Sequence, residues 1–352
     1  PVLVWVGDPL GTDFTQEVDP VTGDLTVRHN DGRMTVYSQV AGFYELQRSV
    51  NLRGEVETYC YYGSSQSEAC KSVDVASAKR QMQFALDSLA ATGVDTGTAE
   101  FKVPELKAGD PGLDFSVRAD GSIAFYAARD KTEWQDIPNS LFTISEFGHV
   151  TVNQLEGTKI TQSIELRSDG TLVSVTENDA DGRVTDTYRY DDGGVKILSH
   201  SVYTYFSTDK ESADFRQLKM VETYNVAELN TRLIKDLTVT SGGSPRGTIE
   251  SRAHYLARHA EKKTDEVTGK DLGNEVLLGR FDYLGLGLVD YTENYLKPLT
   301  PGGEARFLSI VEQQYTLFLL TRSVTYKNPA GGGFCGAGFS GCEITSFDEM
   351  AY

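Results

Sequence analysis

The sequence predicts a mainly β protein, an antiparallel meander of hairpins with one substantial α-helix near residues 68–92. Two observations lead to this prediction. A short turn pattern that ends in glycine and leads into alternating apolar and polar residues recurs along the chain. A segment around residue 80 shows sustained helical spacing. The hairpins are compatible with one large sheet, a sandwich or an open barrel.

The turn pattern appears six times. In each copy, turn residues precede a glycine that supplies the positive φ of a tight hairpin. Alternating residues follow, as expected for a half-buried strand. The copies span 29–37, 118–126, 146–152, 167–175, 179–185 and 191–198, with the glycines at Gly32, Gly121, Gly148, Gly170, Gly182 and Gly193.

Longer hairpin connections complete the meander. Segments 227–237 and 249–260 fit a helical spacing as well as a strand, so both alternatives stay open there. The longer turns are predicted at 19–24, 241–246, 265–270 and 300–303, with Gly23 and Gly269 in the left-handed position.

The predicted helix over 68–92 carries one apolar stripe. Its members recur at spacings of three and four and should pack on a face of the sheet or plug an open end. Gly93 is a natural stop for this helix. The stripe consists of Val75, Ala78, Met82, Ala85 and Leu89.

The best candidate linker, at 107–113, divides the chain in two. Residues 1–110 form an N-terminal β region with a disulfide loop and the helix, and residues 111–352 form an antiparallel β-meander domain. The alternative is one continuous domain, because length alone is a soft guide to domain count.

The four cysteines fall into two local pairs, Cys60 with Cys70 and Cys335 with Cys342. Neither spacing is that of a zinc or redox motif, and both pairs can close short loops. We predict two disulfides and an oxidising compartment, which is extracellular, at the cell surface or periplasmic. The alternative is four reduced, buried thiols. No glycosylation sequon occurs, so a bacterial setting fits best.

The chain is acidic, with 33 basic and 51 acidic residues and a net charge of −18. Such a surface repels phosphate backbones, so no nucleic-acid partner is expected. No apolar run approaches the roughly 18 residues of a spanning helix, so no transmembrane helix is predicted.

One stretch resembles a calcium loop in its spacing. Glu177, Asp179 and Asp181 take the first, third and fifth positions, and Gly182 takes the sixth. Tyr188 stands at the twelfth position, where a bidentate Glu is needed, and the flanks alternate like strands. The favoured interpretation is a hairpin apex, with Gly182 supplying the φ and Asp181 the local hydrogen bond. No cofactor is predicted, and calcium is the one ion with a candidate site.

No catalytic residue is predicted. The glycine pattern at 336–341 lacks a strand–turn–helix context for dinucleotide binding. A carboxylate pair for glycoside hydrolysis cannot be picked out among 51 acids. Two tyrosine pairs, Tyr188 with Tyr190 and Tyr203 with Tyr205, lie on one strand face each. They suit either sheet packing or stacking on sugar rings.

These observations favour a secreted or cell-envelope binding or assembly protein of the surface or adhesion type, without catalytic activity. Its partner would be a protein or glycan surface, or further copies of the chain. The first alternative is a polysaccharide-active hydrolase or lyase that uses a carboxylate pair. The second is a half-barrel that binds a lipid or another apolar ligand.

Overall fold

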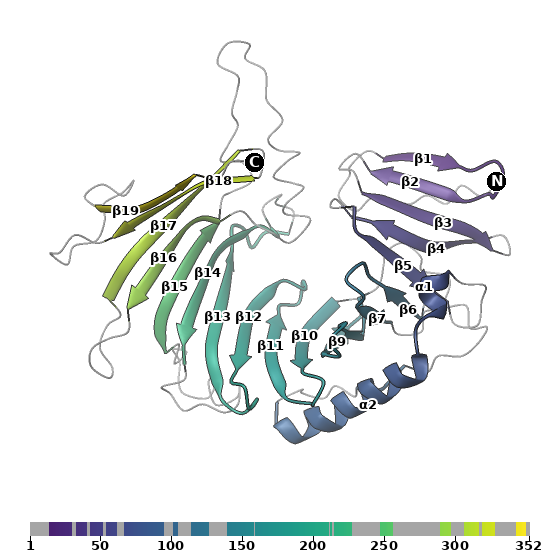
Figure 1. Ribbon diagram of the computed structural model, residues 1–352, viewed down its shortest axis with the longest axis horizontal. Helices are drawn as coiled ribbons and strands as arrows, with labels where there is room; N and C mark the ends of the chain where they lie inside the picture. Colours follow the sequence, from purple (N-terminus) through teal and green to yellow (C-terminus); the bar gives the residue numbers. More distant parts are fainter. Residues whose placement is uncertain are drawn as a thin grey trace, which may run out of the picture. The chain divides into compact units, whose positions relative to one another are not determined.

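Nineteen β-strands and two α-helices make up the part of the chain that the computed structural model describes (Figure 1). The strands form one open antiparallel sheet, which confirms the predicted mainly β fold. The described residues are 14–29, 33–40, 43–51, 54–61, 67–94, 101–104, 114–126, 139–157, 159–210, 212, 215–226, 247–255, 289–296, 306–316, 319–327 and 343–349.

The chain divides into two units, and the division falls within one strand, β11. Unit 1 comprises Pro1–Val175 and Ala180–Gly182, and unit 2 comprises Thr176–Asp179 and Arg183–Tyr352. The domain boundary predicted near residue 110 lies outside the described residues and stays a prediction.

Unit 1 holds the first ten strands, the first part of β11 and both helices. The strands are β1 (Phe14–Val18), β2 (Leu25–His29), β3 (Met34–Val40), β4 (Phe43–Val50), β5 (Val56–Cys60), β6 (Phe115–Val117), β7 (Ile123–Phe125), β8 (Phe142–Ile144), β9 (Val150–Glu156), β10 (Lys159–Leu166) and β11 (Leu172–Asn178). The helices are α1 (Glu68–Lys71) and α2 (Val75–Thr92).

Unit 2 continues as strands that each pair antiparallel with the next one along the chain. Segment 249–260, which fitted either structure, is a strand as far as Tyr255, whereas 227–237 lies outside the described residues. The strands are β12 (Val184–Tyr190), β13 (Ile197–Tyr205), β14 (Leu218–Asn225), β15 (Thr248–Tyr255), β16 (Val289–Leu296), β17 (Arg306–Thr316), β18 (Leu319–Lys327) and β19 (Glu343–Glu349).

The predicted hairpin glycines are confirmed at four of the six turns. At Gly121, Gly148 and Gly170, the glycine N–H donates to the carbonyl three residues earlier, and a three-residue loop places glycine in the left-handed region. The turn at 179–183 also has its glycine there, with Asp179 N donating to Arg183 O. The φ values are 78° at Gly121, 78° at Gly148, 83° at Gly170 and 76° at Gly182.

The turn after β12 differs from the prediction, because its left-handed glycine is Gly194 and not Gly193. Asp191 N donates to Lys196 O, so this loop is one residue longer than its relatives. The position that needs a positive φ therefore moves one residue along the chain. Gly23 has the predicted left-handed φ of 76°, whereas Gly32 and Gly269 lie outside the described residues.

The predicted helix is confirmed as α2, which begins at Val75 and not at residue 68. Residues 68–71 form the separate short helix α1. The carboxylate of Asp74 accepts the N–H of Ser77 and caps a new helix start, which explains the break. Gly93 ends α2 with a φ of 71°, as predicted. Four members of the stripe are buried, namely Ala78, Met82, Ala85 and Leu89.

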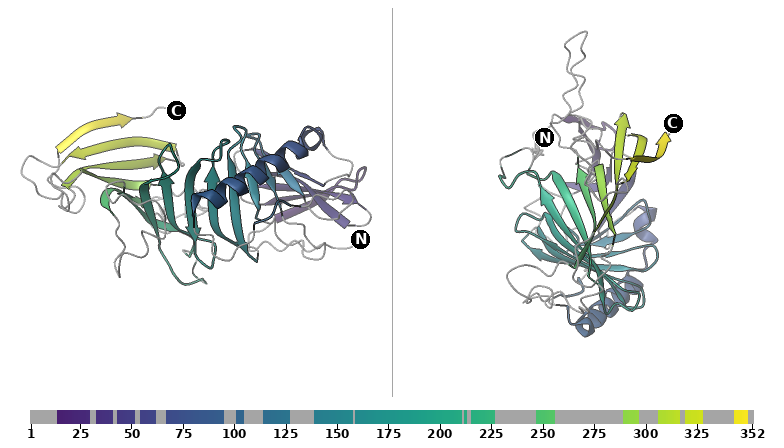
Figure 2. Two further views of the ribbon diagram at one scale, coloured as in Figure 1. Left: turned by 90° about the horizontal axis from the view of Figure 1, so that it is seen from below. Right: turned by 90° about the vertical axis from the view of Figure 1, so that its left-hand side faces the viewer.

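Strand alternation gives the sheet of unit 1 two different faces between β5 and β10. One cross-strand row is wholly apolar, and each of its members is at most 1% exposed. Helix α2 lies on this face (Figure 2), where Ala85 and Phe84 face Val150 and the turn at Ser168 across a small gap. The row runs Cys60, Phe115, Phe125, Phe142, Val152 and Ile164.

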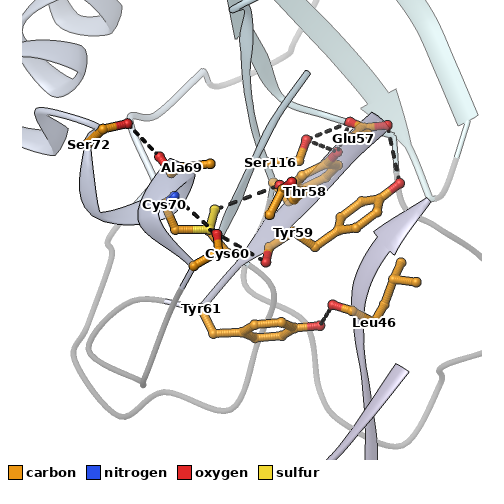
Figure 3. Close-up of a disulfide and its surroundings, with 12 residues drawn as sticks. Leu46, Glu57, Thr58, Tyr59, Cys60, Tyr61, Ala69, Cys70, Ser72 and Ser116 are labelled. Carbon is orange, nitrogen blue, oxygen red and sulfur yellow. Dashed lines mark hydrogen bonds between the residues drawn. A yellow bond between two sulfur atoms is a disulfide. The ribbon is translucent and has the colours of Figure 1, made fainter. Parts of the chain in front are cut away.

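The disulfide between Cys60 and Cys70 confirms the first predicted cysteine pair. It joins β5 to α1, with the Cα atoms 5.6 Å apart, and both residues are buried (Figure 3). It therefore anchors the start of the helical segment on the apolar face of the sheet. Cys335 and Cys342 lie outside the described residues, so their pairing stays a prediction.

Candidate functional site

The opposite face of the unit 1 sheet carries a polar hollow of about 440 Å³ that is open to solvent. Its residues come from β5 and β8–β10 and from the chain next to β6 and β7. Where the structure describes the chain, these residues combine one acid, one base, hydroxyls and amides, and a single aliphatic side chain. The lining consists of Glu57, Arg118, Tyr126, Asn139, Ser140, Thr143, Thr151, Asn153 and Ile160.

The hollow follows from the same alternation that builds the apolar row. On the polar face, small side chains meet across the central strands, where Thr143 pairs with Thr151 and Ala124 pairs with Thr143. Longer side chains from the neighbouring rows stand around them, so the small side chains leave space between the longer ones. Sheet register therefore brings the strand residues of the hollow together, and residues next to the strands complete the described lining.

Glu57 is the hydrogen-bond centre at one end of the hollow. Its Oε1 accepts from Ser116 Oγ at 2.6 Å and from Arg118 Nε at 3.3 Å. It also accepts from Tyr126 OH at 3.4 Å, and Tyr59 OH donates to Oε2 at 3.2 Å. Figure 3 shows Glu57 and the Tyr59 ring turned away from the disulfide. Four donors, from β5, from β6, from the turn after β6 and from the residue that follows β7, thus hold the carboxylate in place.

The tyrosines around Glu57 act as hydrogen-bond donors. Burial, together with the negative charge of Glu57, raises the pKa of Tyr59 and of Tyr126 well above its ordinary value. Both hydroxyls therefore stay protonated at neutral pH. Next to them, Tyr61 OH donates to Leu46 O at 2.9 Å within a buried aromatic cluster. This cluster gives the hollow a rigid wall.

A network of amides and hydroxyls forms the other end of the hollow. Asn153 is buried, and its Nδ2 donates to Ser140 O at 2.8 Å. Its Oδ1 accepts from Ser163 Oγ at 2.6 Å. Ser140 Oγ lies 3.2 Å from Thr143 Oγ1. Buried polar side chains that support each other in this way keep their orientation when a ligand binds.

The chemistry of the hollow suits binding. It offers hydrogen-bond acceptors and donors that are already oriented, next to one aliphatic side chain. Hydrolysis of a glycoside usually requires two carboxyl groups about 5–9 Å apart. Glu57 is the single carboxylate among the described residues that line the hollow. The carboxylate-pair alternative therefore gains no support at this site.

Two carboxylates of unit 2, on β14 and β16, lie near one arginine, Arg252. Arg252 Nε donates to Glu222 Oε1 at 2.8 Å, and its Nη1 lies 3.8 Å from Glu293 Oε2. Arg252 Nη1 also donates to Tyr295 OH at 3.1 Å. Acid–base catalysis needs two carboxyls in different environments. Here both face the same guanidinium, so the arrangement ties three strands together.

Two of the three candidate calcium ligands bind a cation through their carboxylates. Asp179 Oδ2 accepts from Arg183 Nε at 2.7 Å, and Asp181 Oδ1 accepts from Lys159 Nζ at 3.1 Å. Glu177 contributes its backbone carbonyl to Thr185 Oγ1 at 3.2 Å. Within the described ranges no group of three His, Cys, Asp or Glu side chains could hold a metal. Calcium binding at this turn stays a prediction, and a calcium titration of the melting temperature tests it.

The turn itself is capped by a different aspartate from the one predicted. Asp179 Oδ1 accepts the backbone N–H of Arg183 at 3.0 Å, whereas Asp181 reaches Lys159. Arg183 also donates to the carbonyls of Ser207 and Phe215, both at 3.0 Å. The arginine side chain thus draws Asp179 into the turn, which the sequence pattern did not indicate.

The tyrosine pairs considered for sugar stacking are mostly engaged in packing. Tyr188 and Tyr190 are buried, and the Tyr188 ring stacks on His200 with centroids 4.5 Å apart. Arg183 lies over the Tyr205 ring, 4.9 Å from its centroid. Tyr188, Tyr190 and one face of the Tyr205 ring are therefore covered by protein.

Sequence reasoning singled out none of the residues that line the hollow. A usable signal exists in the polar residues at alternate positions of short strands, such as Glu57, Thr143 and Thr151. Each is the residue that an ordinary solvated strand face would also carry. Only the strand register shows that they meet in one place.

No protein-family model matches the chain, and no curated protein matches it. Among solved structures, the chain is similar to a porin-like protein from Bacteroides uniformis, at 10% identity and a TM-score of 0.24. The match covers 88% of this chain and 92% of that one. At this TM-score the similarity carries no conclusion about fold or function. Within the described residues, neither helix has the length and apolar character needed to cross a membrane.

Proposed function

We propose that the protein is a non-catalytic binding protein of an oxidising compartment, extracellular, at the cell surface or in the periplasm. Its ligand is a glycan, bound in the hollow of unit 1. The observation that carries the proposal is the Glu57 carboxylate, held by four side-chain donors beside a wall of hydroxyls and amides.

A glycan fits the hollow because sugar hydroxyls both donate and accept hydrogen bonds. The hollow presents the Glu57 carboxylate as acceptor, and Thr143, Thr151 and Asn139 as further polar groups. Ile160 adds an apolar surface for the carbon face of a sugar ring. A lipid or other apolar ligand would instead leave the polar groups of this hollow without partners, which costs free energy.

The disulfide supports the proposal of an oxidising compartment. Cys60–Cys70 is the kind of bond that persists in secreted and periplasmic proteins and is rare in the cytosol. The acidic surface keeps the chain soluble and disfavours nucleic acid as the partner.

A glycan array together with a reducing-sugar assay tests this function. We expect binding of oligosaccharides without release of new reducing ends. Thr151→Phe fills the hollow and should abolish binding. Thr204→Phe makes the same change at an exposed position of β13 and should leave binding unchanged. Circular dichroism confirms that both variants are folded.

Three outcomes contradict the proposal. Turnover of a bound glycan would establish the hydrolase or lyase alternative. Equal binding by the wild type and Thr151→Phe would place the glycan elsewhere. An array without any bound glycan, with light scattering that shows concentration-dependent oligomers, would favour self-assembly as the function.

A further inference from the structure

We infer that the hollow selects an acidic sugar, a glycan unit that carries a carboxylate, and that Arg118 determines this specificity. The inference rests on the proposed function and adds the class of ligand. Arg118 is the single cation among the described residues that line the hollow.

The position of Arg118 is fixed at both its backbone and its side chain. Its N–H donates to Ser122 O at 2.9 Å, and its carbonyl accepts from Gly121 N at 3.0 Å. The residue therefore opens the three-residue hairpin loop between β6 and β7. On the side chain, Nε is directed at Glu57 Oε1. The guanidinium is thus oriented before any ligand arrives.

Only one nitrogen of the Arg118 guanidinium, Nε, donates a hydrogen bond to Glu57. Among the described residues, its two terminal amino groups have no hydrogen-bond partner. Two adjacent N–H groups of a guanidinium match the two oxygens of a carboxylate in a bidentate pair. This geometry is what an acidic sugar requires.

The exposed fractions of Arg118 and Glu57 show which of these two charged groups a ligand can reach more easily. The Arg118 side chain is 40% exposed, against 25% for Glu57. The Glu57 carboxylate already accepts from Ser116, Tyr126 and Tyr59. A ligand that binds Arg118 therefore does not leave Glu57 without partners. The guanidinium is therefore the more exposed of the two charged groups, although the chain as a whole is acidic.

The charge balance also limits the ligand. Glu57 neutralises Arg118 at contact distance, and the net charge of the chain is −18. A dense polyanion would be repelled before it reached the hollow. A glycan with an isolated carboxylate among neutral hydroxyls avoids this repulsion. Its hydroxyls can form hydrogen bonds with Thr143 and Asn153, which line the hollow. We therefore expect a sparsely acidic glycan.

The test compares matched acidic and neutral oligosaccharides, for example glycans with a uronic acid and the same glycans reduced to the neutral sugar. Wild type should bind the acidic member better, and Arg118→Gln should weaken that binding by about tenfold or more. Arg118→Gln should leave the neutral member within about twofold. Arg118→Lys should recover part of the preference, because lysine keeps the charge and loses the bidentate fork. Arg189→Gln is the matched control, since it removes an exposed arginine of unit 2.

The outcomes separate this inference from the proposed function. If neutral glycans bind and Thr151→Phe abolishes that binding, while Arg118→Gln leaves the acidic-to-neutral ratio unchanged, the glycan site stands and the inference fails. If no glycan binds wild type, the proposed function itself fails. If Arg118→Gln and Arg189→Gln weaken the acidic member equally, the preference is a general charge effect and the inference is overturned.

Discussion

The two faces of the unit 1 sheet are built from the same strands and carry different side chains. On the apolar face, Phe115, Phe125 and Phe142 are at most 1% exposed and α2 lies over the sheet. On the polar face, the neighbouring positions hold Thr143 and Thr151, which leave a hollow. We therefore expect substitutions on the first face to act mainly on stability, and substitutions in the hollow to act mainly on the proposed glycan binding. Variants on the two faces should separate these properties.

The largest effect is expected on the apolar face, from Met82→Ala in α2. Met82 is fully buried, so its truncation should lower the free energy of unfolding by about 2–5 kcal/mol. Denaturant unfolding measures the loss. Phe84→Ala, at a position 49% exposed on the same helix, is the control and should cost less. Glycan binding of the folded Met82→Ala protein should be unchanged. A loss of binding without unfolding would show that the two faces are coupled.

The next effect concerns the contact between α2 and the hairpin turn at Gly170. A Cβ at this position would lie 2.8 Å from Ser88 Cβ, and the φ of 83° is strained for any other residue. Gly170→Ala should therefore destabilise by more than the about 1–2 kcal/mol that a left-handed alanine costs.

Gly182→Ala is the matched control for that substitution. Its φ is 76°, and the nearest atom to a new Cβ is Lys159 Cβ at 3.9 Å, so it has the strain without the clash. In thermal unfolding, Gly170→Ala should lower the melting temperature more than Gly182→Ala does. Equal losses would mean that α2 does not press on the turn at Gly170.

A smaller effect on stability is expected on the polar face, from Glu57→Gln. The amide keeps one acceptor oxygen but replaces the other with a donor that faces Arg118 or Tyr59. We expect a loss of about 1–3 kcal/mol, since donors that met a carboxylate lose a strong acceptor. Glu156→Gln, which removes the charge of an exposed residue on β9, should be neutral. Unfolding by urea distinguishes them, and equal stability of the two would contradict the role of Glu57 as the centre of the network.

The two faces also differ in how far the sequence predicts them. Glycine turns, strand alternation and the α2 stripe are local patterns, so Gly121, Gly148 and Met82 could be placed before the structure was known. The Cys60–Cys70 pair is close in sequence and was predicted for the same reason. The hollow joins Glu57 to Arg118, 61 residues away, and depends on register across six strands. No local pattern contains that register.

Two errors in local detail have the same origin. The prediction assigned the left-handed position to Gly193 and the turn hydrogen bond to Asp181. The structure has Gly194 in that conformation, because the loop is one residue longer. It has Asp179 as the cap, because Arg183 reaches both the Asp179 carboxylate and the carbonyl of Phe215. Loop length and a tertiary arginine contact decided these details.

The smallest predicted effect is a pH dependence at the turn that positions Arg118. Side-chain and backbone hydrogen bonds from Ser122 hold the pKa of Asp120 below its ordinary value of 3.8. Because the folded-state pKa is lower than the unfolded one, this stabilisation is complete above pH 3.8. It is lost as the pH falls through the folded-state value. Asp120→Asn keeps an acceptor for the Ser122 N–H but does not titrate.

Urea unfolding between neutral pH and about pH 2 measures this dependence, and the full span crosses the ordinary range of an aspartate. The stability of the wild type should fall more steeply on acidification than that of Asp120→Asn. Asp169→Asn, like Asp120→Asn, should lose less stability on acidification than the wild type. Asp169 accepts the N–H of Thr171 at 2.9 Å, and its pKa is also lowered. If acid weakened all three proteins equally, carboxylates elsewhere would govern the pH dependence. The turn that holds Arg118 would then owe its shape to Gly121 and not to Asp120.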